Sequence, residues 1–205
     1  TGTCNVMAAA TLAAGVTTVR DMGAEQRFIT AFRDSVAGGR GLGPRLLLAG
    51  LVDGAGDGGF GATTAATPQE GRAVVDRYHA ARFEQIKLYS LLRPDVVSAI
   101  VSRAHELGMT VTGHVPAALG TAGAVEAGMD HVAHMPINGE PSSPEVRALI
   151  DLLARRKTVV DPTLPWNELL GRAPGTWIAE FETGFTRAPA ALAISYSSVT
   201  NNTDA

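Results

Sequence analysis

Residues 94–134, PDVVSAIVSRAHELGMTVTGHVPAALGTAGAVEAGMDHVAH, contain two successive units of helix, glycine and strand. Gly108 and Gly128 each follow a segment with apolar residues at helical spacing, a position where glycine commonly ends a helix in a left-handed turn. The runs after these glycines are apolar and β-branched, as in strands that are buried on both faces. The expected helices and strands, in chain order, are Pro94 to Leu107, Met109 to His114, Gly120 to Ala127 and Asp130 to His134.

The same alternation extends over most of the chain. Thr67 and Glu70 form a capping box at one helix start, and Ser143 precedes a proline at another. Repeated units of this kind favour an α/β fold with a parallel sheet and right-handed crossovers, either closed as a barrel or left open. Further strands are expected at Val16 to Asp21, Arg45 to Gly50, Gln85 to Tyr89 and Thr158 to Asp161, and further helices at Val6 to Ala14, Gln69 to Arg82 and Pro144 to Arg156.

The composition is that of a globular protein and argues against several functional classes. The chain has 205 residues, of which 45% are hydrophobic and 18% are charged, so it can bury a sizeable core. Its net charge of -3 and the lack of a Lys/Arg stripe argue against nucleic-acid binding. No apolar run reaches the roughly 20 residues of a membrane span, and no leader is visible. We therefore expect a soluble chain without membrane partners, and the sequence leaves its localisation open.

Two segments depart from the alternation. Residues 53–66 are rich in Gly, Ala and Thr, and we expect a long loop there, on the side of the sheet where active-site loops gather. Residues 166–205 have weak periodicity, and we expect an irregular or helical extension with a frayed end. The expected organisation is thus a partial barrel over residues 1–165, with residues 166–205 as an extension of the same domain.

Strand ends are expected to bring three chemically distinctive side chains together. Because alternate residues of a strand face opposite sides, Lys87 shares a face with Tyr89, and His114 and His134 come at the ends of the next two strands. Barrel enzymes place their catalytic groups at this carboxyl edge of the sheet. The same alternation predicts that His131 faces away from His134, toward the helix layer.

The chemistry of these side chains favours a metal site, although each residue alone would more often be structural. Neutral imidazole is a good ligand for Zn²⁺ and similar ions. A buried lysine with a lowered pKa can react with CO₂ to give a carbamate, an anionic ligand able to bridge two metals. Lys87, His114 and His134 are therefore the candidate catalytic and metal-binding residues. Tyr89 is the candidate substrate-binding residue, with packing at the barrel rim as the alternative.

Six runs carry a likeness to a known family: Ala13 to Gly23, Gly43 to Arg45, Ile86 to Tyr89, Ala104 to Gly108, Gly113 to Val115 and Ala127 to His134. In order and spacing they resemble the amidohydrolase superfamily, and more narrowly its imidazolonepropionase-like and Xaa-Pro dipeptidase-like branch. The likeness covers residues 8–165. It implies an incomplete (β/α)₈ TIM barrel, in which the strands resembling the second to the seventh are present and the first and eighth are not evident.

The resemblance also implies roles for the candidate residues. Lys87 would be carboxylated and would bridge two divalent ions, expected to be Zn²⁺, while His114 and His134 would be ligands after the fifth and sixth barrel strands. The implied activity is hydrolysis of an amide-like C–N bond, in a dipeptide or a cyclic amide, by a metal-bound hydroxide. His105 matches a motif histidine on the helix before the fifth strand, for which a structural role is favoured.

The family pattern is incomplete in this sequence. The family also has a His-x-His pair after the first strand and a proton-shuttling aspartate after the eighth. The sequence contains no His-x-His, and Asp204 only superficially echoes the aspartate. A non-catalytic fragment or degenerate homologue of the same barrel is therefore an open alternative. A small-molecule substrate is expected, and both a homo-oligomer and completion by a missing segment stay open.

A third interpretation is nucleotide binding, because Gly54 to Gly59 matches the dinucleotide fingerprint G-x-G-x-x-G after a strand. The next helix is expected to begin only near Thr67, too far along for its N-terminus to contact a pyrophosphate. We therefore favour the hydrolase. Outside these motifs, we expect Arg20 and Asp21 to form a structural ion pair and His79 to lie at the surface.

Overall fold

The computed structural model describes residues 2–134, 137–164, 184–187 and 190. The chain divides into two compact units, Thr1–Pro162 and Thr163–Ala205. In the second unit the described secondary structure includes a short 3-10 helix, Phe185–Arg187. Most of the extension expected over residues 166–205, including Asp204, lies outside the described residues. No helix in the described ranges is long and apolar enough to cross a membrane.

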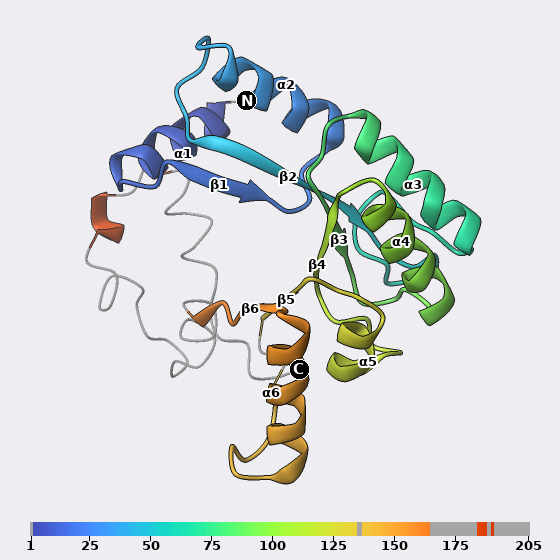
Figure 1. The fold of residues 1–205 in the computed structure, drawn as a ribbon. Coiled ribbons are helices and arrows are strands. Elements are labelled where there is room, and N and C mark those ends of the chain that lie inside the picture. Colours follow the sequence, from blue (N-terminus) through green and yellow to red (C-terminus); the bar gives the residue numbers. More distant parts are fainter. Residues whose placement is uncertain (1, 135–136, 165–183, 188–189, 191–205) are drawn as a thin grey trace. The chain divides into compact units, whose positions relative to one another are not determined.

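The first unit alternates helices and parallel strands, as the sequence predicts. Its strands lie side by side in an arc, with the helices on the outer side (Figure 1). The elements are α1 (Gly2–Ala13), β1 (Thr18–Asp21), α2 (Gln26–Ala37), β2 (Arg45–Val52), α3 (Pro68–Ala80), β3 (Gln85–Leu88), α4 (Pro94–Glu106), β4 (Thr110–Gly113), α5 (Gly120–Glu126), β5 (His131–Ala133), α6 (Pro144–Arg156) and β6 (Val159–Asp161).

Strand pairing follows chain order throughout the first unit. Strands β1 to β4 form one parallel sheet and β5 pairs with β6 in a second. A backbone bond from Asp130 N to Val111 O, 3.0 Å long, links the two sheets across β4 and β5. Each strand is thus beside its sequence neighbour, which is the order of a β/α barrel. The six strands described do not close into a complete barrel.

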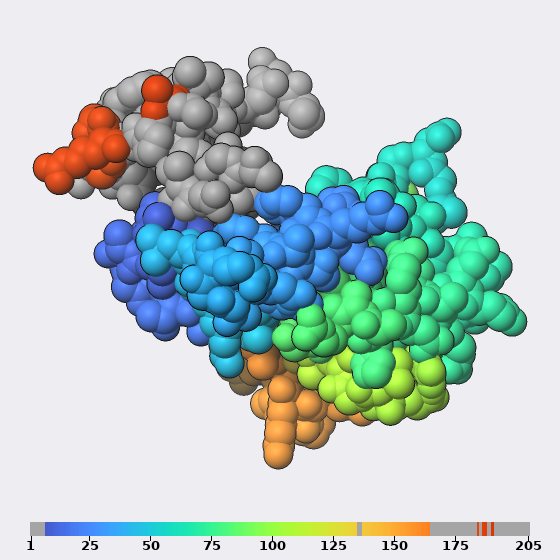
Figure 2. Space-filling model, turned by 90° about the horizontal axis from the view of Figure 1, so that it is seen from above, coloured from blue at the N-terminus to red at the C-terminus, as the bar shows by residue number. Residues whose placement is uncertain are grey.

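The core lies between the strands and the outer helices. Alternate side chains of β2, β3 and β4 belong to one hydrophobic cluster with apolar side chains of α3 and α4. Residues of α2, α3 and α4 lie next to one another on the face of the first unit that Figure 2 shows. The fully buried members include Leu48, Val52, Ile86, Leu88, Val96, Val97, Ile100 and Val111.

Helix α2 is the one element of the first unit that the sequence reading missed. Its N-cap is Glu25, whose carboxylate accepts bonds from Arg27 N and Phe28 N. Glutamate is not among the preferred capping residues, so the usual start signal is absent. The helical spacing was nonetheless available, because Phe28, Phe32 and Val36 pack against the core.

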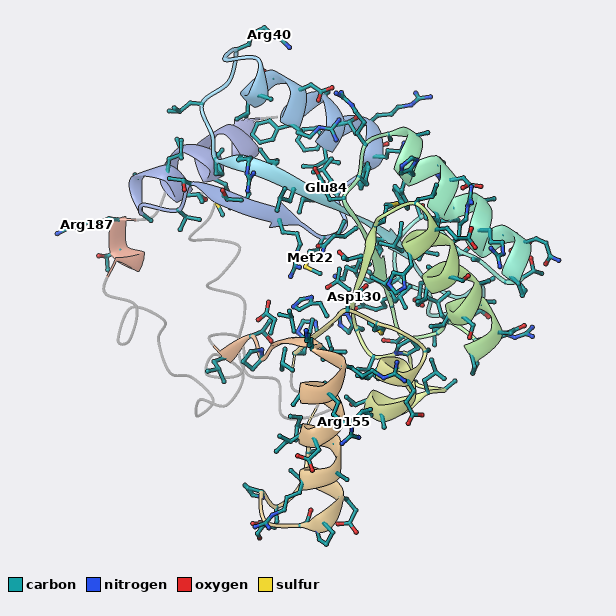
Figure 3. All side chains as sticks on the ribbon, viewed as in Figure 1. Met22, Arg40, Glu84, Asp130, Arg155 and Arg187 are labelled. Carbon is teal, nitrogen blue, oxygen red and sulfur yellow. The ribbon has the colours of Figure 1, made fainter. Side chains whose placement is uncertain are left out.

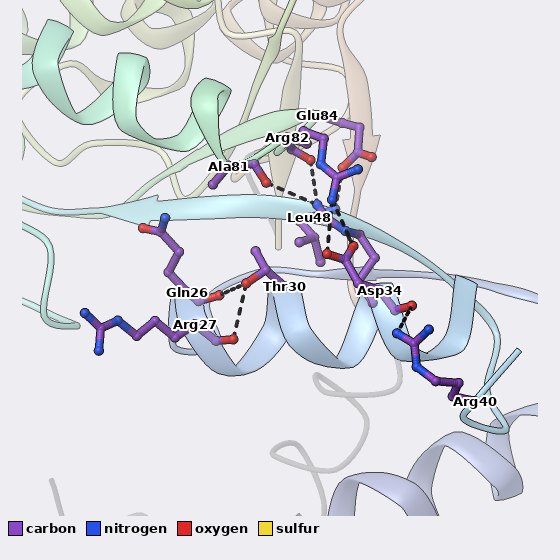
Figure 4. Close-up of polar contacts among 10 residues, drawn as sticks. Gln26, Arg27, Thr30, Asp34, Arg40, Leu48, Ala81, Arg82 and Glu84 are labelled. Atoms are coloured by element: carbon purple, nitrogen blue, oxygen red, sulfur yellow. Dashed lines mark hydrogen bonds and ion pairs between the residues drawn. The ribbon is translucent and has the colours of Figure 1, made fainter. Parts of the chain in front are cut away.

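Arg33 on α2 ties this helix to the turn before β3. Its Nη1 donates to Arg82 O at 2.7 Å and to Ala81 O at 3.3 Å, while its Nε donates to Asp34 Oδ1 at 3.0 Å. Figure 4 labels the acceptor residues Asp34, Ala81 and Arg82. The Arg33 side chain is only 12% exposed. The carbonyls of Ala81 and Arg82 therefore accept charge-assisted hydrogen bonds from a largely buried guanidinium.

Replacing Arg33 by alanine is expected to lower the free energy of unfolding by about 2 kcal/mol, because charge-assisted bonds to the turn carbonyls are lost. Arg40→Ala is the control, since exposed Arg40 makes only a 3.3 Å bond to Asp34 O, and its effect should stay within about 0.5 kcal/mol. Urea unfolding followed by far-UV circular dichroism measures both. Equal effects of the two substitutions would contradict the role given to Arg33.

Candidate active site

The carboxyl edge of the sheet gathers the four residues that the sequence singled out. Lys87 lies in β3, and its register partner in β4 is Thr112, so both side chains are on one face. Tyr89, His114 and His134 each follow directly after the last residue of a strand. The strand order thus brings residues from three βα units to one edge.

Ring contacts show how close these side chains are. The His114 ring is 4.2 Å from the His134 ring and 4.1 Å from the Tyr89 ring, measured between centroids. Lys87 Nζ lies 5.6 Å from the centroid of Tyr89. The four residues therefore form a single cluster. A cavity of about 280 Å³ adjoins it and is lined by His114, Val115, Gly120, Thr121, Ala133, His134 and Asn138.

The alternation predicted for β5 is wrong. His131 Nδ1 is hydrogen-bonded to Thr112 Oγ1, which places His131 on the face of Lys87 and not toward the helices. Val132 instead belongs to the core shared with the helix layer. His134 has a φ of +69°, so a left-handed residue turns its side chain back toward His114 after the strand has ended.

Asp130 explains why the ladder is interrupted here. Its Oδ2 accepts a 2.8 Å bond from Val111 N and lies 2.9 Å from Nε2 of His105 on α4. The carboxylate of Asp130, directly before β5, thus accepts a bond from a backbone amide of β4; Figure 3 labels Asp130 near the start of β5. His105 bridges α4 to this carboxylate, in agreement with the structural role favoured for it.

Burial sets the protonation states of the cluster. Desolvation lowers the pKa of His114 to about 4, with smaller contributions from His134 and Lys87. Desolvation also lowers the pKa of His134, as does nearby Lys87. The pKa of Lys87 is lowered by desolvation too, against an opposing effect of Asp21. At neutral pH both imidazoles are therefore available as neutral nitrogen donors.

The pKa of His114 predicts a pH dependence of stability. Because this pKa is lowered to about 4 from 6.5, the unfolded chain binds more protons than the folded chain between these values, so stability should fall as pH decreases from 6.5 toward 4. Two-dimensional NMR of the histidine ring protons in metal-free protein measures the titration directly. A midpoint above 6 for His114 would contradict the burial inferred for it.

Asp53 is a site residue that the sequence reading did not single out. It is completely buried just after β2, and its carboxylate accepts 2.8 Å bonds from Gly54 N, Phe60 N and Leu91 N. The available signal was an aspartate directly before a glycine-rich loop, because such a carboxylate can bind several loop amides. Asp53 thereby fixes two loops at the edge that carries His114.

The same contacts weaken the nucleotide-binding interpretation. The amides of Gly54 and Phe60 donate to the Asp53 carboxylate, which would repel a phosphate. The Thr67 half of the predicted capping box is confirmed, since Thr67 Oγ1 accepts from Glu70 N, while Glu70 Oε2 accepts from Ala66 N, one residue before the N-cap. The N-terminus of α3 is therefore already capped.

Two minor predictions have opposite outcomes. The ion pair expected between Arg20 and Asp21 is wrong: Arg20 donates to Gln85 Oε1 at 3.1 Å, and Asp21 accepts from the amides of Gly23 and Ala24. Neighbouring strand residues point to opposite faces, which explains the separate partners. His79 is exposed on α3, as expected.

No family model matches this sequence, and no curated protein matches it. Solved structures do. One is described as a prolidase from Bifidobacterium longum, at 25% identity and a TM-score of 0.56 over 73% of this chain and 40% of that chain. A second is a Xaa-Pro dipeptidase with bound methionine, at 24% identity and a TM-score of 0.59 over 77% of this chain and 44% of that chain.

A third is the ochratoxinase of A. niger, at 16% identity and a TM-score of 0.66 over 81% of this chain and 46% of that chain. This chain has part of the fold of an amidohydrolase barrel. The likeness to prolidases and other amidohydrolases that the sequence motifs predict is thereby confirmed. The chain spans less than half the length of these amidohydrolase-fold structures, so only part of the barrel can be compared.

Proposed function

We propose that the protein is a metal-dependent hydrolase of amide-like C–N bonds, with Lys87, His114 and His134 as metal ligands and Lys87 carboxylated. The observation that carries the proposal is the cluster itself, in which two imidazole rings lie 4.2 Å apart beside a half-buried lysine. The solved structures that share the fold include an amidohydrolase and a Xaa-Pro dipeptidase.

The residues present fit a metal. The buried Nδ1 of His114 has no hydrogen-bond partner in the described part of the chain, and its pKa of about 4 keeps the ring neutral. Among the described residues, no three His, Cys, Asp or Glu side chains gather as a ligand group. We propose that Lys87 supplies a further donor as its carbamate anion, because the unmodified ammonium has no lone pair.

The surroundings of Lys87 support the proposed carboxylation. Desolvation lowers the pKa of its amine, which increases the fraction able to attack CO₂. Bound divalent metal, which we propose to be a pair of Zn²⁺ ions, would activate a water and polarise the scissile carbonyl. The hydroxyl of Tyr89, beside His114, would orient the substrate. Dipeptides and cyclic amides are the proposed substrate class.

The test combines metal content with activity. Protein loaded with Zn²⁺ in the presence of bicarbonate is expected to bind more metal than protein loaded without CO₂, and Lys87→Arg should abolish this difference because a guanidinium does not form the carbamate. Hydrolysis of a panel of Xaa-Pro dipeptides and cyclic amides, with chelator as control, tests the activity. A chain that binds no metal under either condition would instead be the non-catalytic homologue of the barrel.

A further inference from the structure

Two exposed apolar side chains stand on neighbouring loops at the carboxyl edge of the sheet. Phe60, in the loop after β2, is 53% exposed, and Leu91, in the loop after β3, is 44% exposed. Both loops lie on the side of the sheet that carries His114.

One buried carboxylate holds both loops. Asp53 Oδ2 accepts from Phe60 N at 2.8 Å, and Asp53 Oδ1 accepts from Leu91 N at 2.8 Å. Gly54 brings the two loops into contact, because a Cβ added there would lie 2.1 Å from Leu91 O. The position of the Phe60 backbone is therefore fixed from within the core, independently of what its side chain contacts.

The aromatic rings continue from this loop to the candidate metal site. The Phe60 ring is stacked on the Tyr89 ring, with centroids 4.6 Å apart and planes 19° apart, and Tyr89 in turn contacts the His114 ring at 4.1 Å. Tyr89 thus has an aromatic neighbour toward the loop and another toward the site. Phe60 is 53% exposed, whereas Tyr89 is partly buried, so Phe60 offers more accessible aromatic surface than Tyr89.

We propose that Phe60 is a specificity-determining residue that binds a planar apolar group of the substrate, such as a phenyl ring, and that Asp53 is the positioning residue that holds Phe60 over Tyr89. The proposal for Phe60 rests on the proposed function, because that function places the scissile bond of the substrate at His114. The preferred substrate is an amide with an aromatic side chain close to the scissile bond. Ring stacking and burial of the apolar face of Phe60 supply the preference.

The experiment measures ring preference by direct binding. The dissociation constants of N-acetyl-L-phenylalaninamide and N-acetyl-L-alaninamide are obtained by ligand-observed NMR on the full chain, without metal and with Zn²⁺. Wild type should favour the phenyl ligand, and Phe60→Ala should reduce this preference about fivefold, within the range expected for one aromatic contact. Leu42→Ala is the matched control, because Leu42 is a 69% exposed apolar residue on another loop, and it should leave the preference unchanged.

Asp53→Asn tests the positioning role. The substitution weakens the hold on Phe60, so it should reduce the phenyl preference, and the double variant with Phe60→Ala should show no further reduction. If Asp53 had only a structural role, Asp53→Asn would weaken the binding of both ligands equally and leave the ratio of their dissociation constants unchanged. Intact far-UV circular dichroism is required of each variant, and Phe60→Leu provides a second variant that keeps apolar bulk without a ring.

Two results would overturn the proposal: equal binding of the two ligands by wild type, or an unchanged preference in both Phe60 variants. Failure of the proposed function is distinguishable from either. A chain that binds no Zn²⁺ but still shows a phenyl preference dependent on Phe60 would refute the metal site and leave the aromatic contact in place.

Discussion

A chain in which His114 is replaced by alanine is expected to lose Zn²⁺ affinity by at least about a hundredfold, since loss of a direct ligand should exceed the effect typical for outer contacts of a metal site. His114 is central to the cluster, because its ring contacts both Tyr89 and His134. Competition against a fluorescent zinc chelator at pH 7.5 measures the affinity. At this pH the wild-type imidazole is neutral, because its pKa is about 4.

His79→Ala is the matched control. His79 is exposed on α3 and is not part of the cluster, so its loss should leave the affinity unchanged if binding is specific. Equal losses in the two variants would show adventitious binding to surface histidines. An unchanged affinity in His114→Ala would remove His114 from the ligand set, and with it the proposed metal site.

Much of the site's position could be predicted because it depends on strand ends. Apolar runs that stop at polar residues mark where β3 and β4 finish, and parallel strands place those ends at one edge. The positions of Lys87 and His114 follow from this alone, as their shared neighbour Tyr89 shows. The observed order, with each strand beside its sequence neighbour, agrees with the tendency of consecutive elements to be adjacent in space, whereas the right-handed crossover rule alone also allows other orders.

The wrong prediction for His131 arises because local side-chain contacts in β5 override the strict alternation of side chains along a strand. In β5, Asp130 takes the amide of Val111 with its side chain, and His131 bonds to Thr112. His134 then reaches His114 only through a left-handed backbone. An alternation rule assumes an uninterrupted ladder, so it placed His134 correctly for the wrong reason and placed His131 on the wrong face.

The role of Asp53 depends on contacts between distant segments. Its bond to Leu91 N joins residues 38 positions apart, and the need for Gly54 arises from Leu91 O. Neither contact has a local sequence pattern, because a glycine needed for close approach looks like any loop glycine. The glycine-rich run therefore matches the pattern of a phosphate-binding loop, whereas its amides bind a carboxylate of the same chain.

Replacing Gly113 by alanine is expected to destabilise the fold by about 3 kcal/mol, since overpacking against backbone and an unfavourable φ act together. Gly113 is the last residue of β4, has a φ of +124°, and would place a Cβ 2.3 Å from Leu88 O of the neighbouring strand. That carbonyl also accepts His114 N at 3.1 Å, so it cannot move without moving His114. Zn²⁺ affinity should fall together with stability.

Gly15→Ala separates the cost of the unfavourable φ from the cost of overpacking. Gly15 also has a positive φ, +84°, but an added Cβ there would meet nothing within 4 Å. Its substitution should therefore cost only the conformational strain, about 1 kcal/mol, and should leave Zn²⁺ affinity unchanged. Urea unfolding of both variants, with zinc titration under native conditions, measures the difference. If the two alanines destabilised the chain equally, contact with the Leu88 carbonyl would carry no energy, and the coupling inferred between the end of β4 and the position of His114 would be refuted.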